Sequence, residues 1–249
     1  MNRCFMALLA GGVAACASGE PDSWQPSELH LAYDGTCTAT TPGGPGFTEV
    51  TLHNTAGQTH QATLVRLDDA TPDSTIAAWY TRRDSMPPSG AAWIGGPGAT
   101  PPGGSSAVML HLSIGRYLAL CLPTEPDSGS PEPPAMASFD IDSLPVPHDQ
   151  GPPLTDAILQ IGADSVTWLP TPAPGRRIVR ISNEQPGTVT VWLTRLDDGD
   201  RPEVLGGISE LGAGREGWIT VTFRRGPHKV VVMDGARRAP EVVTGFVIE

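Results

Sequence analysis

The chain has 249 residues, 39% of them hydrophobic, and a formal net charge of −11. Its 16 Lys and Arg residues form no cluster longer than a pair, which argues against nucleic acid or anionic lipid headgroups as partners. Gly (29) and Pro (26) interrupt many short apolar segments, a pattern that is typical of an all-β protein.

Residues 1–16 have the form of a lipoprotein signal peptide. A short positive start, MNR, precedes the apolar run CFMALLAGGVAA, which is too short to span a bilayer as a mature helix. The run leads into VAAC, which resembles a bacterial lipobox, so we expect Cys16 to carry the lipid. The alternative is an ordinary secretion signal that is cut nearby. Because Ala17 is not Asp, the resemblance favours the outer membrane, and residues 17–27 are expected to form a flexible tether.

The chain contains an internal duplication. Residues 28–69 align with residues 157–198 without a gap, and the two copies align again from their Gly-Gly pairs to their ends. Between these segments the first copy carries an insertion that includes TPDSTIAAWYTRR. We therefore expect two domains, 28–143 and 154–249, joined by a Pro-rich linker at 144–153.

Each copy consists of short strands. TEVTLHN (48–54) and RIVRISN (177–183) alternate apolar and polar residues, as half-buried strands do, and several similar segments follow in both copies. Seven or so strands in a unit of this size predict a β-sandwich. In the insertion, the spacing of Ile76, Trp79 and Tyr80 predicts a short helix with these three residues on one face.

One longer pattern runs through the first copy: NxxxxxHQxxLVRL, a short helix, GG, then GxxxxVxLxLxxGxYxLxC and a Met before the last strand. This pattern resembles the cupredoxin-like domains of bacterial secreted proteins and lipoproteins, over 28–142 and more weakly over 154–249. The resemblance implies two tandem Greek-key β-sandwiches. In copper-binding members of the family it also implies a site of two His, one Cys and a weak axial Met.

The copper ligands are only partly present. His60, Cys121 and Met136 stand at three of the four ligand positions, but no histidine lies between Cys121 and Met136. Glu132 lies in that segment, and a carboxylate does not favour copper(I) beside a thiolate. The second copy has valine at all three matching positions: Val189, Val232 and Val243. We therefore expect a degenerate site with no favoured metal or cofactor, and copper at His60, Cys121 and Met136 as the alternative.

The cysteines favour a different arrangement. Apart from Cys4 and Cys16 in the signal segment, only Cys37 and Cys121 remain, and an exported chain usually pairs such a couple. Both positions are valine in the second copy, as expected of buried neighbours. A Cys37–Cys121 disulfide is therefore predicted, and it would use up the thiolate that copper needs. The alternatives are copper ligation by Cys121 and two free thiols.

No motif in the chain indicates catalysis. GxSxG and a phosphate-binding loop are absent, and the Asp68–Asp69 pair that recurs at 197–198 is typical of a strand end entering a turn, with Arg66 as a candidate ion-pair partner. We therefore expect a non-catalytic, lipid-anchored envelope protein with a binding or structural role, whose protein or small-molecule partner the sequence does not identify. The alternative is a copper-binding or electron-transfer protein. Trp79, Tyr80 and Trp93 are candidates for a contact surface or for docking the helix.

Overall fold

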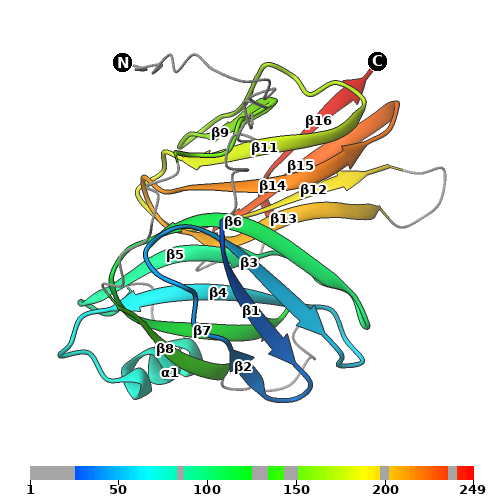
Figure 1. The fold of residues 1–249 in the computed structure, drawn as a ribbon. Coiled ribbons are helices and arrows are strands. Elements are labelled where there is room, and N and C mark those ends of the chain that lie inside the picture. The colour runs from blue at the N-terminus through cyan, green and yellow to red at the C-terminus, as the bar shows by residue number, and fades with distance from the viewer. Residues whose placement is uncertain (1–25, 83–86, 125–133, 143–150, 197–201, 235–239) are drawn as a thin grey trace, which may run out of the picture.

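The computed structural model describes residues 26–82, 87–124, 134–142, 151–196, 202–234 and 240–249. The predicted signal segment with Cys16, Glu132, and residues 144–150 of the predicted linker lie outside the described residues. The described residues form sixteen strands and one helix (Figure 1). Within these ranges, no helix is both long enough and apolar enough to cross a membrane.

The two copies fold into equivalent sets of strands. The first unit comprises β1 (Ser27–Tyr33), β2 (Cys37–Ala39), β3 (Gly46–Asn54), β4 (His60–Leu67), α1 (Asp73–Arg82), β5 (Ala91–Pro97), β6 (Ser105–Leu112), β7 (Gly115–Pro123) and β8 (Ala135–Ile141). The second unit comprises β9 (Ala157–Ile161), β10 (Val166–Leu169), β11 (Gly175–Asn183), β12 (Val189–Arg195), β13 (Glu203–Leu211), β14 (Glu216–Phe223), β15 (Gly226–Asp234) and β16 (Pro240–Ile248).

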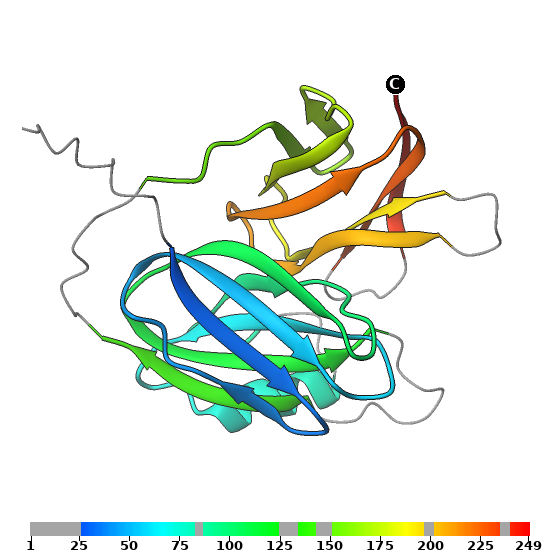
Figure 2. The ribbon, with the colours of Figure 1, turned by 45° about the vertical axis from the view of Figure 1, so that its right-hand side comes forward.

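The strands form two sheets, and each unit contributes half of each sheet. One sheet has the order β10-β9-β11-β14-β6-β3-β1-β2 and the other β16-β15-β12-β13-β5-β4-β7-β8. In both units the first strand is parallel to the third, while the hairpins are antiparallel. Figures 1 and 2 show each unit as a sandwich of two layers. The predicted fold class, an all-β protein of two tandem sandwiches with a short helical insertion in the first, is confirmed.

Burial follows the sequence pattern of each strand. In β3, Val50 and Leu52 are fully buried, while Glu49 just before them and His53 just after them are exposed. Strand β7 lacks this alternation because both of its faces are covered. One face contributes to the main core between the sheets, and the other packs with Ile76 and Trp79 of α1 in a second apolar cluster. The insertion therefore buries an outer sheet face of the first unit.

The gapless alignment of the first strands is wrong by one residue. Leu29 of β1 pairs with Val50, whereas Ala157 of β9 pairs with Val179, the counterpart of Val50. Leu29 therefore corresponds to Ala157 and not to Ile158. The turn between β9 and β10 is one residue longer than the turn between β1 and β2, which restores the predicted alignment from there on.

The two units meet through equivalent strands. β5 pairs with β13 at two residues, and β6 pairs with β14 at two residues, all antiparallel. A polar contact adds to this junction, because Tyr80 Oη and Trp93 Nε1 (3.2 Å) both donate hydrogen bonds to Oε2 of Glu210 in the second unit. Glu210 is 6% exposed, and Trp79 and Trp93 are buried as well. The three aromatic residues of the insertion region therefore hold α1 in place rather than forming an exposed contact surface.

Candidate binding pocket in the first unit

His60 and Cys121 lie on the same face of one sheet. Strands β4 and β7 are antiparallel, with His60 opposite Pro123 and Ala62 opposite Cys121. Residues that face each other across such a pair share a face, and so do every second residue along each strand. Both side chains therefore point toward the interior between the two sheets, at the end where β4 begins and β7 ends.

The predicted disulfide is present. Sγ of Cys37 and Sγ of Cys121 are 2.08 Å apart, and the bond links β2 of one sheet to β7 of the other. Both cysteines are buried, with 7% and 2% of their surface exposed. In the second unit the valine at the position of Cys121, Val232, is fully buried, and Val166 packs against the same core. The two units thus fill one interior position with a disulfide in the first case and with aliphatic side chains in the second.

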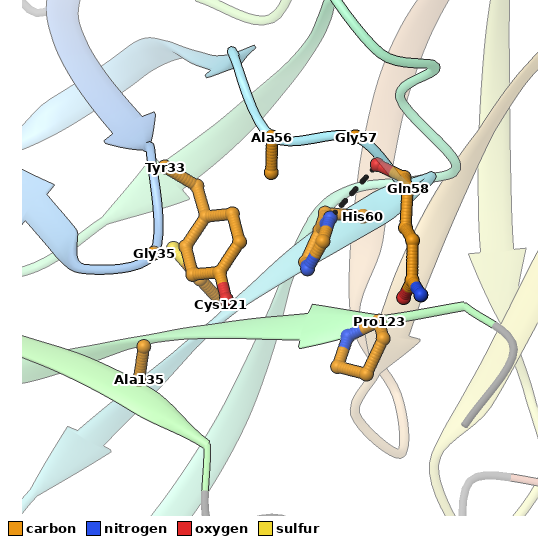
Figure 3. A pocket seen from close by; sticks show the side chains of 9 residues that line it. All are labelled: Tyr33, Gly35, Ala56, Gly57, Gln58, His60, Cys121, Pro123 and Ala135. Atoms are coloured by element: carbon orange, nitrogen blue, oxygen red, sulfur yellow. Dashed lines mark hydrogen bonds between the residues drawn. The ribbon is translucent and has the colours of Figure 1, made fainter. Parts of the chain in front are cut away.

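The ring of His60 is buried and oriented by the main chain. Only 5% of the residue is exposed, and Nδ1 lies 3.0 Å from the carbonyl oxygen of Gln58. In the neutral ring Nδ1 carries the proton and donates it to this carbonyl, so Nε2 is left as a hydrogen-bond acceptor. The ring packs against Tyr33, with 4.1 Å between the ring centroids. Figure 3 shows Nε2 on the side of Pro123, away from the bond to Gln58.

Met136 lies on the opposite face of the sheet from Cys121. In the pairing of β7 with β8, Met136 is opposite Leu120, and Ala135 is opposite Cys121. Met136 packs with Leu120 in the apolar cluster under α1. Its thioether therefore does not converge with His60 and Cys121, although the three residues follow one another in the order that the resemblance implies.

The residues present do not fit a copper centre. The Cys121 thiol is in the disulfide, and Met136 faces α1. Across the described parts of the chain, no group of three or more His, Cys, Asp or Glu side chains is placed to hold a metal ion. Glu132, the substitute considered for the second histidine, lies outside the described residues.

A pocket of about 490 Å³ lies at this position. Its lining residues are Tyr33, Gly35, Ala56, Gly57, Gln58, His60, Cys121, Pro123 and Ala135 (Figure 3). Among the described residues the lining includes no Asp, Glu, Lys or Arg, so hydrogen bonds and ring contacts are what these residues offer a ligand. The phenol of Tyr33 can donate or accept, and Nε2 of His60 can accept, which suits a small polar molecule with a flat face and a hydrogen-bond donor.

Asn54 holds the turn that lines one side of this pocket, a role that the sequence reasoning missed. Its Nδ2 donates to the carbonyls of Gln58 (2.7 Å) and Thr100 (2.8 Å), and its Oδ1 accepts the N–H of Ala56 (3.1 Å). These bonds fix the turn that carries three of the lining residues. The exact recurrence of this asparagine in the second copy was the signal that could have revealed the role.

Asn183 holds the equivalent turn in the second unit. Its Nδ2 donates to the carbonyls of Gly187 and Leu211, both at 2.8 Å, and its Oδ1 accepts the N–H of Gln185 (2.9 Å). The frame is therefore kept, but fully buried Val189 stands where the first unit has His60. The repeated asparagine serves folding, and the histidine that does not recur is specific to the pocket.

Asp68, the first residue of the repeated acidic pair, has a structural role. Oδ1 of Asp68 accepts the hydroxyl of Thr71 (2.5 Å) in the turn before α1. Residues 197 and 198, its counterparts, lie outside the described residues. The guanidinium of Arg195, the residue that corresponds to Arg66, lies 4.0 Å from the carboxylate of Glu203.

The sequence matches no protein-family model and no curated protein. Among solved structures, the chain is similar to auracyanin from the photosynthetic bacterium Roseiflexus castenholzii, with 22% identity over 37% of this chain and 81% of that chain and a TM-score of 0.28. It is also similar to Lac15 from a marine microbial metagenome, with 14% identity, 90% and 67% coverage and a TM-score of 0.26. A copper-containing nitrite reductase from Thermus scotoductus gives 10% identity, 90% and 61% coverage and a TM-score of 0.23. Scores this low carry no argument about the fold or function of this chain.

Proposed function

We propose that this chain is a non-catalytic binding protein of the cell envelope with two cupredoxin-like sandwiches. It is exported, anchored in the membrane by lipid on Cys16, and binds a small polar molecule in the His60 pocket instead of copper. One observation carries the proposal. Cys121, which lines the pocket, is bonded to Cys37 and has no free thiol for copper, while the buried ring of His60 presents a hydrogen-bond acceptor to the same pocket.

Export is supported by the same disulfide. Structural disulfides form and persist in oxidising compartments and are rare in the cytosol. Because both sulfur atoms are buried between the sheets, the bond is a part of the fold rather than an exposed redox couple. Together with the lipobox-like sequence, it favours a mature protein that folds outside the cytoplasm.

Lipidation is expected to depend on Cys16 alone. In a bacterial host, the full chain should incorporate labelled palmitate and sediment with membranes, and Cys16→Ala should lose both properties. Cys4→Ala is the matched control and should keep both, since Cys4 lies in the part of the signal that is removed. Label that persists in Cys16→Ala, or wild-type chain that stays out of the membrane fraction, would refute the anchor.

Ligand binding is expected to depend on His60. Residues 17–249, oxidised, would be melted with phenol, with benzamide and with copper(II), each over a range of concentrations. We expect the two organic probes to raise the Tm of the wild type and of His111→Ala, whose ring is exposed elsewhere in the first unit. His60→Ala should show no such increase, because it removes the acceptor at Nε2.

Copper provides the opposing outcome of the same experiment. We expect no intense visible absorption when copper(II) is added, since a thiolate ligand is required for it and none is available. A strong visible band that is lost in His60→Ala would support the copper-binding alternative instead. If neither organic probe distinguishes His60→Ala from His111→Ala, the pocket is not the binding site.

A further inference from the structure

The junction between the units has an approximate two-fold axis. Pro97 and Ile208 occupy equivalent positions after the two Gly-Gly pairs, and they pair with each other across the junction. When equivalent residues of two antiparallel strands face one another, a local two-fold axis passes between them. The other sheet crosses the same junction through β6 and β14, which Figure 1 shows side by side in green and orange.

The second sheet obeys this symmetry on only one side of the axis. Leu110 of β6 pairs with Gly217 of β14. Val221 is the counterpart of Leu110 and Ser106 the counterpart of Gly217, so the symmetry implies a mirrored pair of Ser106 with Val221. In the described parts of the chain β6 and β14 share two residue pairs, and the mirrored ones are not among them. Strands β6 and β14 are therefore paired on one side of the axis and separate on the other.

A cleft of about 510 Å³ lies where β6 and β14 separate. It is bordered by residues 105–109 of β6 on one side and 218–220 of β14 on the other, and residues 204–207 of β13 line it as well. The far edges of β6 and β14 are paired with β3 and β11. Two strand edges therefore face each other across the cleft, and the N–H and C=O groups on such edges need partners.

We propose that this cleft binds an extended peptide segment of a partner protein, which completes the ladder along the open edge of β6. About four residues would fit along this edge at the usual rise of a strand. The lining favours small or β-branched uncharged side chains, because it combines glycines with aliphatic residues: Val108, Leu205, Gly206, Gly207 and Ile219. Main-chain hydrogen bonds supply the affinity in this mode of recognition, and the lining supplies the selectivity.

This site is separate from the His60 pocket and goes beyond the function proposed above. No residue that the structure describes lines both. A peptide suits the cleft better than a compact molecule does, because its walls offer main-chain edges that only another extended backbone can match along their length. Glu49 and Arg176 also line it, so that the described lining has one side chain of each charge and favours neither acidic nor basic peptides.

The sequence of β14 itself supplies a probe. Residues 219–223, ITVTF, would have continued the ladder with β6 if the two strands had stayed together. We expect fluorescein-labelled ITVTF-amide to bind the oxidised 17–249 chain in a polarisation titration. IPVPF-amide should bind at least tenfold more weakly, because each proline removes an N–H that the edge of β6 needs.

Two variants decide where the peptide binds. Ala107 is exposed and lines the cleft, so Ala107→Trp should close its mouth and weaken ITVTF binding at least tenfold. Ala32→Trp is the matched control, an exposed alanine on β1 of the same sheet, and should leave binding unchanged. Amide hydrogen exchange at Ala107 should slow when the peptide is bound. Equal binding of the two peptides, equal loss in the two variants, or unchanged exchange would each overturn the proposal. Binding of phenol through His60 is unaffected by any of these outcomes.

Discussion

Replacing both Cys37 and Cys121 with serine is expected to lower the free energy of unfolding by about 4 kcal/mol. The bond closes a long loop, with a sequence separation of 84, and in the chain-entropy description its loss frees the unfolded chain by about that amount. The two hydroxyls would also be buried between the sheets, which costs further stability. Chemical denaturation of residues 17–249, monitored by tryptophan fluorescence, measures the difference.

The second unit provides the control for this experiment. Valine stands at both positions there and packs in the core, so Cys37→Val with Cys121→Val should recover about 1–2 kcal/mol relative to the serine pair. A serine pair that loses less than about 1 kcal/mol would mean that the disulfide does not hold the two sheets together. Equal stability of the valine and serine pairs would mean that water reaches the side chains at these two positions.

Replacing Asn54 with alanine is expected to cost about 3 kcal/mol. The side chain donates to two carbonyls and accepts one N–H, and Asn54 is 1% exposed, so alanine removes three hydrogen bonds in or near the interior. The two carbonyls keep the bonds that they accept from His60, whereas the N–H of Ala56 loses the acceptor at Asn54. Asn183→Ala should cost about the same, since its side chain makes the matching bonds in the second unit. Denaturant unfolding of both variants tests this expectation.

Two further variants separate the hydrogen bonds from the size of the side chain. Asn54→Asp keeps the shape but replaces the donating amide by a carboxylate that faces two carbonyls, so it should be at least as damaging as alanine. Thr55→Ala changes the adjacent exposed residue and should stay within about 0.5 kcal/mol of the wild type. A small effect of Asn54→Ala would show that water replaces the amide, and the repeated asparagine would then need another explanation.

The fold was predictable because the strands alternate or run apolar over the correct lengths. TEVTLHN and its counterpart in the second copy each became a strand with one buried face, and Ile76 and Trp79 of the insertion became the buried face of a helix. The disulfide was predictable because both cysteines change to valine together. These signals are local or are repeated in the chain, so a single sequence contains them.

The arrangement around the site was less predictable, because it depends on which face of a strand a residue takes. Met136 stands at the expected place in the chain, yet a shift of one residue along a strand reverses the face, and its register places it under α1. The error of one residue in β1 has a similar origin, since a single extra residue in a turn leaves little trace in a sequence. Glutamate is usually found on the surface, and the burial of Glu210 is explained by the packing of the insertion against the second unit.

The pairing of equivalent strands across the junction has a consequence for how such a chain arose. A single ancestral unit with the same exposed edges on β5 and β6 would have met a second copy of itself through an isologous interface, as a homodimer. Duplication of such a gene within one reading frame would have joined two subunits that were already associated. In a covalently linked pair, each mutation changes only one half. This chain has the helix, the disulfide and the histidine in its first unit, and Glu210 in its second unit bonds to that helix, a difference that a symmetric homodimer cannot have.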